Sequence, residues 1–201
     1  MAYKDFTLEK LEVDFGIKNK KELIFTQTPS VLPSKWLIQT LDLGKNLPIR
    51  SEKSRSELIV APILVETRQR NKDFITFYSG ERLDADRQRG LVGECDFIIA
   101  KETGSYSLSL PLLAVVEAKK QDLDLGINQC AAQLYGAKIF NETRKISLPA
   151  IYGCVTTGEE WLFLKLEAMT FSINTNKYNL KELPLILGIF QTIIDSYKHI
   201  Y

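Results

Sequence analysis

The sequence predicts one α/β domain in which a mixed central sheet is flanked by helices. A chain of 201 residues with 45% apolar content can bury one substantial core but would make two cramped domains. Segments with the alternating or unbroken apolar patterns of strands lie between segments with helical periodicity. A strand, helix, strand succession over residues 112–156 implies that its two strands are parallel.

The charge balance excludes a strong overall electrostatic field. The chain has 26 Lys and Arg residues against 25 Asp and Glu residues, so a polyanion would have to be held locally. The N-terminal segment lacks the apolar core of a secretory signal, and no stretch approaches the roughly 18 apolar residues of a membrane span. We therefore expect a cytoplasmic protein that does not associate with membranes.

The first fifty residues contain two predicted short helices. One spans residues 8–15 and ends at Gly16, and the other spans 35–43, with Ser34 as its start and Gly44 as its end. Because both precede the first strand pattern, we interpret this region as a helical cover of the core.

A longer helix is predicted over residues 52–70. Apolar residues such as Leu58 and Ile63 follow helical spacing, and Pro62 is expected to kink the helix. Glu57 is the acidic residue that borders its apolar face early in the helix.

The first predicted strand, residues 73–80, ends at Gly80, and a polar loop follows to Gly90. This loop and the preceding helix end are rich in arginine. These side chains are candidates for a phosphate-binding surface, although scattered arginines are more often simply solvated. The five are Arg68, Arg70, Arg82, Arg87 and Arg89.

The second predicted strand, residues 91–100, alternates so that one face is apolar and the other carries two carboxylates. The two faces are Cys95, Phe97 and Ile99 on one side, and Glu94, Asp96 and Ile98 on the other.

The third predicted strand, residues 112–119, begins with apolar residues and ends with charged ones. Its faces are Val115, Glu117 and Lys119 on one side, and Ala114, Val116 and Ala118 on the other. If the second and third strands form a hairpin, Asp96 lies opposite position 115, 116 or 117. Such neighbours are about 5 to 8 Å apart, close enough for two carboxylates to share a metal ion.

The remaining pattern predicts a helix over residues 123–140, on which Gln129 and Gln133 are one turn apart. Two strands joined by a turn at Gly158 follow. Residues 182–201 suit an amphipathic helix, used for packing or for self-association as a homodimer.

Cysteine and histidine usage gives little support for zinc or disulfides. Cys95, Cys130 and Cys154 are widely spaced without a CxxC pair, and His199 is the only histidine. A cysteine hydrolase stays open as an alternative, but buried and inert thiols are the commoner explanation in such apolar surroundings.

The order helix, three strands, helix, strand over about residues 52–167 resembles the PD-(D/E)XK superfamily, the restriction-endonuclease-like fold. The "GECDF" and "VEAKK" strands look closest to uncharacterised bacterial, especially cyanobacterial, members. No proline precedes the aspartate, where Cys95 stands instead, at a position that varies in the superfamily. By this resemblance, Asp96 and Glu117 correspond to the metal ligands, and Lys119 corresponds to the catalytic lysine. Glu57 corresponds to an acidic residue of the first helix, and Gln129 to a polar helper of the second helix.

The resemblance implies a Mg²⁺- or Mn²⁺-dependent nuclease that cleaves DNA, with Glu57 as a further metal-site residue. Cleaving a phosphodiester needs a hard divalent ion bound through oxygens, and a nearby lysine can orient or deprotonate the attacking water. The first alternative is a nuclease-like protein without catalysis, serving as a nucleic-acid-binding or assembly module. The second alternative is purely structural: Glu117 and Lys119 only mark the end of a strand, Glu57 is solvated, and Gln129 only forms a hydrogen bond with the sheet.

Overall fold

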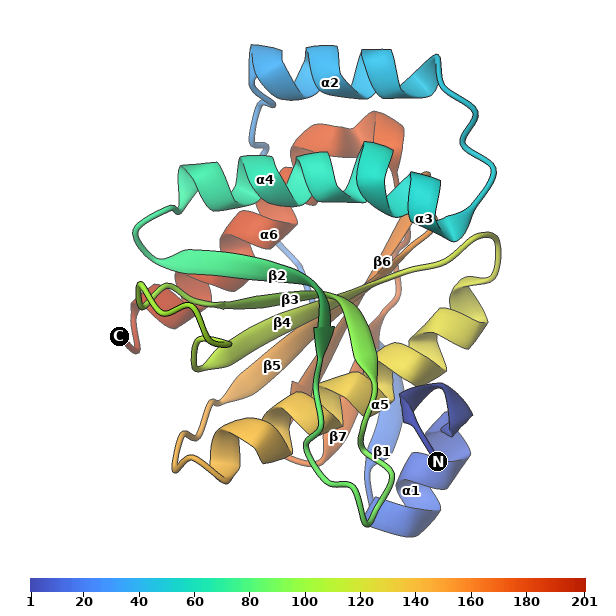
Figure 1. The fold of residues 1–201 in the computed structure, drawn as a ribbon, viewed down its shortest axis with the longest axis vertical. Helices are drawn as coiled ribbons and strands as arrows, with labels where there is room; N and C mark the ends of the chain where they lie inside the picture. Colours follow the sequence, from blue (N-terminus) through green and yellow to red (C-terminus); the bar gives the residue numbers. More distant parts are fainter.

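A computed structural model describes residues 1–201. An eight-stranded mixed sheet lies between two layers of helices (Figure 1). The strands are β1 (Lys18–Glu22), β2 (Ile75–Arg82), β3 (Glu94–Lys101), β4 (Leu112–Ala118), β5 (Ala150–Thr156), β6 (Glu160–Glu167), β7 (Thr170–Asn174) and β8 (Tyr178–Asn179). The helices are α1 (Leu8–Phe15), α2 (Lys35–Lys45), α3 (Glu52–Arg55), α4 (Ala61–Arg70), α5 (Leu123–Glu142) and α6 (Leu183–Lys198).

The sheet order is β1-β7-β6-β5-β4-β3-β2, with β8 paired to β6. The pairs β4–β5 and β1–β7 are parallel, and the other pairs are antiparallel. The predicted α/β class with a mixed sheet is confirmed, including the parallel pair joined through α5. The N-terminal segment, predicted as a purely helical cover, also supplies the edge strand β1.

The two faces of the sheet carry separate apolar cores. Helices α4 and α6 cover one face, with α2 packed on the outside of α4, whereas α5, α1 and the Tyr3–Asp5 turn cover the other face (Figure 1). The predicted C-terminal helix forms as α6 and buries its apolar side in the first core. Its Tyr197 hydroxyl lies 2.8 Å from the Leu113 carbonyl oxygen and 2.9 Å from that of Ala150. The packing role predicted for this helix is therefore confirmed.

Helix α2 begins as predicted and ends later. The Ser34 side chain accepts a hydrogen bond from the Leu37 N–H at the start of the helix. The helix continues through Gly44 to Lys45, so the prediction that Gly44 ends it was wrong. A Cβ at Gly44 would lie 3.0 Å from the Leu58 carbonyl oxygen, so this glycine serves close packing between helices instead.

The predicted helix over residues 52–70 forms with a π-helical turn at Ser56–Val60, between α3 and α4. Within it, the Ala61 N–H donates to the Ser56 carbonyl five residues earlier. Pro62 directly follows this turn, where the hydrogen bonding already departs from the four-residue pattern that a proline interrupts. The extra residue of a π turn rotates the residues before it by about 100° relative to a regular α-helix.

No helix combines the length and the apolar character that crossing a membrane requires.

Candidate functional site

Strands β3 and β4 separate next to Asp96. Their last pair at this end is Phe97 with Val116, so the register places Asp96 opposite Glu117, within the predicted range. The Ala118 N–H donates to the Asp96 Oδ2 atom at 2.7 Å, so a side chain replaces the next backbone bond of the ladder. The Asp96 carboxyl is thereby fixed between the ends of the two strands.

The alternation predicted for β3 is interrupted at this position. Cys95 packs in the core on the α5 side, together with Ile98, whereas Phe97 and Ile99 pack in the opposite core. The expectation that Cys95 shares a face with Phe97 was wrong: beyond Phe97, β3 no longer pairs with β4, although it still pairs with β2 at Cys95 and Glu94. Strand β2 also continues past Gly80, where it was predicted to end, to Arg82.

Glu117 is a buried carboxylate between β4 and α5. Its side chain is 1% exposed, and its Oε1 atom lies 2.7 Å from the Lys119 Nζ atom. Its Oε2 atom accepts a hydrogen bond of 2.8 Å from the Gln133 Nε2 atom on α5. Val115 lies in the core on the same side, and Val116 in the opposite core, so the faces predicted for this strand are confirmed.

The Lys119 ammonium group is the centre of the cluster. Besides Glu117, it donates to the Gln129 Oε1 atom at 3.2 Å and lies 3.7 Å from the Glu52 Oε1 atom. Of the residues predicted to act together, Asp96, Glu117, Lys119 and Gln129 thus gather at the open ends of β3 and β4.

A glycine allows α5 to approach this close. A Cβ at Gly126 would collide with the Val155 side chain and lie 2.9 Å from the Lys119 Cγ atom. The Asp122 side chain begins the helix by accepting hydrogen bonds from the N–H groups of Asp124 and Leu125. These two features bring the glutamines of α5 against β4.

The electrostatics of the cluster disfavour ionisation of both the Asp96 and the Glu117 carboxyl groups. Burial, and then the negative charge of Asp96, raise the pKa of Glu117 to about 7. Burial also raises the pKa of Asp96, although the Ala118 N–H and Lys119 oppose that rise. Burial lowers the pKa of Lys119, but attraction by Glu117 outweighs it and leaves that pKa above its ordinary value. The site therefore favours an additional positive charge, either a proton or a cation.

A groove of about 490 Å³ opens beside Asp96, below α3 and the π turn. Four acidic residues line it: Glu52, Glu57, Glu94 and Asp96. Glu57, predicted as a metal-site residue, is 62% exposed and lies 3.8 Å from the Lys53 ammonium group. Glu52, five residues earlier, is the acidic residue of this segment that approaches Lys119.

Sequence reasoning missed two residues of the cluster, Glu52 and Gln133. Gln133 follows Gln129 by one helical turn, and this spacing was the available signal for it. No comparable signal existed for Glu52, because its direction depends on the π turn.

The cysteines do not form a catalytic site. All three are buried, and burial raises the pKa of each thiol. His199, the only histidine, is exposed beyond the end of α6. Reactive cysteines are accessible and have a lowered pKa, so the structure argues against a cysteine hydrolase.

The five predicted phosphate-binding arginines all form ion pairs within the chain. Their carboxylate partners are Glu102 for Arg68, Glu66 for Arg70, Asp84 for Arg82 and Arg87, and Asp86 for Arg89. These contacts reduce the charge that is free to bind phosphate.

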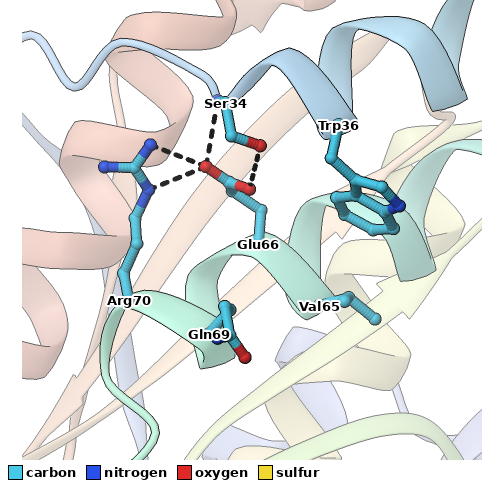
Figure 2. A pocket seen from close by; sticks show the side chains of 6 residues that line it. All are labelled: Ser34, Trp36, Val65, Glu66, Gln69 and Arg70. Carbon is cyan, nitrogen blue, oxygen red and sulfur yellow. Dashed lines mark hydrogen bonds and ion pairs between the residues drawn. The ribbon is translucent and has the colours of Figure 1, made fainter.

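Figure 2 shows one of these pairs in a pocket of about 440 Å³ between α2 and α4. The buried Glu66 carboxylate accepts hydrogen bonds from Ser34 and from the Arg70 guanidinium. Burial opposes its charge, but these hydrogen bonds outweigh burial and lower the pKa of Glu66. Because each charge has a partner, this arrangement ties the start of α2 to α4 and leaves no reactive group.

No group of three or more histidine, cysteine or acidic side chains is arranged to hold a metal ion. Mg²⁺, however, is usually bound through only one or two carboxylates, with water and substrate oxygens completing its shell. Asp96 and Glu117 satisfy this smaller requirement. In comparisons with known proteins, no family model and no curated protein matched the chain, so functional inference rests on the site itself.

Proposed function

We propose that this protein is a metal-dependent nuclease of the PD-(D/E)XK superfamily that hydrolyses phosphodiester bonds of DNA. The observation that carries the proposal is the convergence of Asp96, buried Glu117 and Lys119 where β3 and β4 separate. The order of the surrounding elements supports the restriction-endonuclease-like core: a helical segment, the antiparallel strands β2 to β4, α5, and the parallel strand β5.

Asp96 and Glu117 are the residues that would hold Mg²⁺ or Mn²⁺. They offer hard oxygen ligands, and the raised pKa values of both carboxyls indicate a site that an added cation would stabilise. Once bound, such an ion supplies an activated water and neutralises charge that builds up on the phosphate.

Lys119 acts in this proposal as a fixed cation. Because its pKa is raised, it carries a proton at neutral pH and can donate to the attacking water or to a phosphate oxygen. Gln129 positions the ammonium group from α5, and Gln133 positions the Glu117 carboxylate. Both glutamines therefore orient groups that would contact the substrate.

The proposed acidic residue of the first helix is assigned by its approach to Lys119. Glu57 and Glu52 both line the groove beside Asp96, but Glu52 alone lies 3.7 Å from the Lys119 ammonium group. We therefore propose that Glu52 contributes more to the candidate site than Glu57, which lies at the rim of the groove.

The test is DNA cleavage by the purified protein with added Mg²⁺ or Mn²⁺, repeated with EDTA. We expect cleavage that EDTA abolishes and that Asp96→Ala, Glu117→Ala and Lys119→Ala each reduce strongly while the variants remain folded by circular dichroism. Equal cleavage by wild type and all three variants would end the nuclease proposal. DNA binding without cleavage would support the alternative, a nuclease-like binding module without catalysis.

A further inference from the structure

The N-terminal segment lies along the α5 side of the candidate site and is fixed at two points. Tyr3 is buried, and its N–H donates to the Val92 carbonyl at 3.1 Å. Its ring occupies space that a Cβ at Gly136 of α5 would fill. Five residues later, the Leu8 N–H donates to the Asn128 Oδ1 atom of α5 at 3.1 Å. The backbone between these anchors is thus held beside α5.

Lys4 is the cation between the two anchors. It lines a cavity of about 430 Å³ together with Lys119 and Gln129. It also lines a second cavity, of about 260 Å³, together with Glu94 and Gln129. Gln129, which holds Lys119, therefore borders both spaces that Lys4 borders.

Lys4 is exposed and forms no ion pair within the chain, unlike the five arginines described above. Two carboxylates line the larger cavity with it, those of Asp5 and Glu52. The Asp5 carboxylate accepts a hydrogen bond of 2.8 Å from the Ala2 N–H, and Glu52 lies near Lys119. Lys4 therefore has no ion-pair partner, although Asp5 and Glu52 line the same cavity.

The opposite side of the site is more acidic. The groove beside Asp96 is lined by four acidic residues and by Lys53, which lies near Glu57. A phosphate would be repelled there unless a metal ion neutralised the carboxylates. The two sides therefore differ in charge balance: the groove has four carboxylates and one lysine, whereas the larger cavity on the α5 side has two lysines, Lys4 and Lys119, and two carboxylates, Asp5 and Glu52.

Building on the nuclease proposal, we propose that Lys4 binds a backbone phosphate of the nucleic acid on the α5 side of the bond to be cleaved. The strand would then run from the acidic groove, past Lys119, to the N-terminal segment. Lysine suits this role, because its compact charge binds phosphate without demanding one fixed geometry.

The test measures binding of fluorescently labelled DNA by anisotropy at several salt concentrations, with Ca²⁺ as the divalent ion. The variants are Lys4→Ala and Lys4→Arg, with Lys10→Ala as the matched control. Lys10 is on the same segment, but its ammonium group lies 5.4 Å from the centre of the Phe6 ring and it lines neither cavity. Melting temperatures verify that each variant is folded.

Loss of one phosphate contact should weaken binding and reduce the slope of log K against log salt by about 0.7 to 0.9. We expect this change in Lys4→Ala, restoration in Lys4→Arg, and a wild-type slope in Lys10→Ala. An unchanged slope in Lys4→Ala, an equal change in Lys10→Ala, or no DNA binding by wild type would overturn the inference. Binding that depends on Lys4, in a protein that cleaves nothing with Mn²⁺, would retain the phosphate contact of Lys4 and refute the nuclease proposal.

Discussion

Without metal, the stability of this protein should fall as the pH rises through neutrality, because Glu117 is buried beside a second carboxyl. Its pKa in the folded state is about 7, against an ordinary value of 4.5. Between these values the folded state binds a proton that the unfolded state has released. The stabilisation is therefore fully present below pH 4.5 and is lost as the pH rises through about 7.

The size of this effect follows from the pKa shift. Each pH unit inside the window changes the free energy of unfolding by at most about 1.4 kcal/mol per proton. The whole shift corresponds to about 3 kcal/mol, a large part of the stability of a typical domain.

Asp96→Asn is the most informative perturbation. The amide oxygen of the new side chain can still accept the hydrogen bond from the Ala118 N–H, while the negative charge is removed. Burial is the largest cause of the Glu117 shift, and the charge of Asp96 is the second. The variant should therefore lose less stability with rising pH than wild type, and should be at least as stable as wild type at pH 8.

The assay is chemical denaturation in EDTA at pH values from 4.5 to 8.5, with slopes of denaturant dependence compared to verify two-state unfolding. Glu57→Gln is the control, because this exposed side chain lies in the same groove but does not contact Glu117; its pH dependence should match wild type. The reasoning fails if wild type keeps constant stability across this range, or if Asp96→Asn is markedly destabilised at pH 8.

Three further outcomes follow from the same cluster. Mg²⁺ or Mn²⁺ at ten times its dissociation constant should stabilise wild type by roughly 1.4 kcal/mol and should stabilise Asp96→Asn much less. Melting temperatures with and without the ion measure this difference, and equal shifts in the two proteins would show that the Asp96 carboxylate does not bind the metal. Gln133→Ala leaves one Glu117 oxygen without its hydrogen-bond donor. The free energy of unfolding should therefore fall by about 1 to 3 kcal/mol at pH 8, and by less at pH 5, where Glu117 is protonated. A loss that denaturation curves show to be independent of pH would indicate lost packing alone. In cleavage assays, Glu52→Gln should reduce the rate more than Glu57→Gln, and the reverse order would return the helix carboxylate role to Glu57.

The part of the site that sequence predicted best is the part with strict periodicity. Strand β4 is buried on both faces, so a shift by one residue would move Glu117 from the α5 side into the opposite apolar core. That constraint made the directions of Glu117 and Lys119 predictable from alternation alone. The position of Asp96 opposite Glu117 followed from the hairpin between the two strands.

Features that break periodicity could not be predicted in the same way. The approach of Glu52 to Lys119 depends on the π turn at Ser56–Val60, and no apolar pattern records an extra residue in a helical turn. Cys95 packs on the α5 side at the point where β3 no longer pairs with β4, a break that the apolar alternation does not record. The edge strand β1, with the sequence KNKKE, has no apolar alternation, since its side chains are largely exposed.

The central claim, that Asp96 and Glu117 jointly bind a divalent metal ion, is tested most directly by a crystal structure of the wild-type protein soaked in Mn²⁺. Anomalous scattering would locate the ion without reference to any assumed substrate. We expect one Mn²⁺ at about 2.0 to 2.3 Å from an oxygen of each carboxylate, with Lys119 still held by Gln129. Crystals that contain no Mn²⁺ between these carboxylates, with Lys119 still paired to Glu117, would contradict the account and leave the cluster as a structural ion pair.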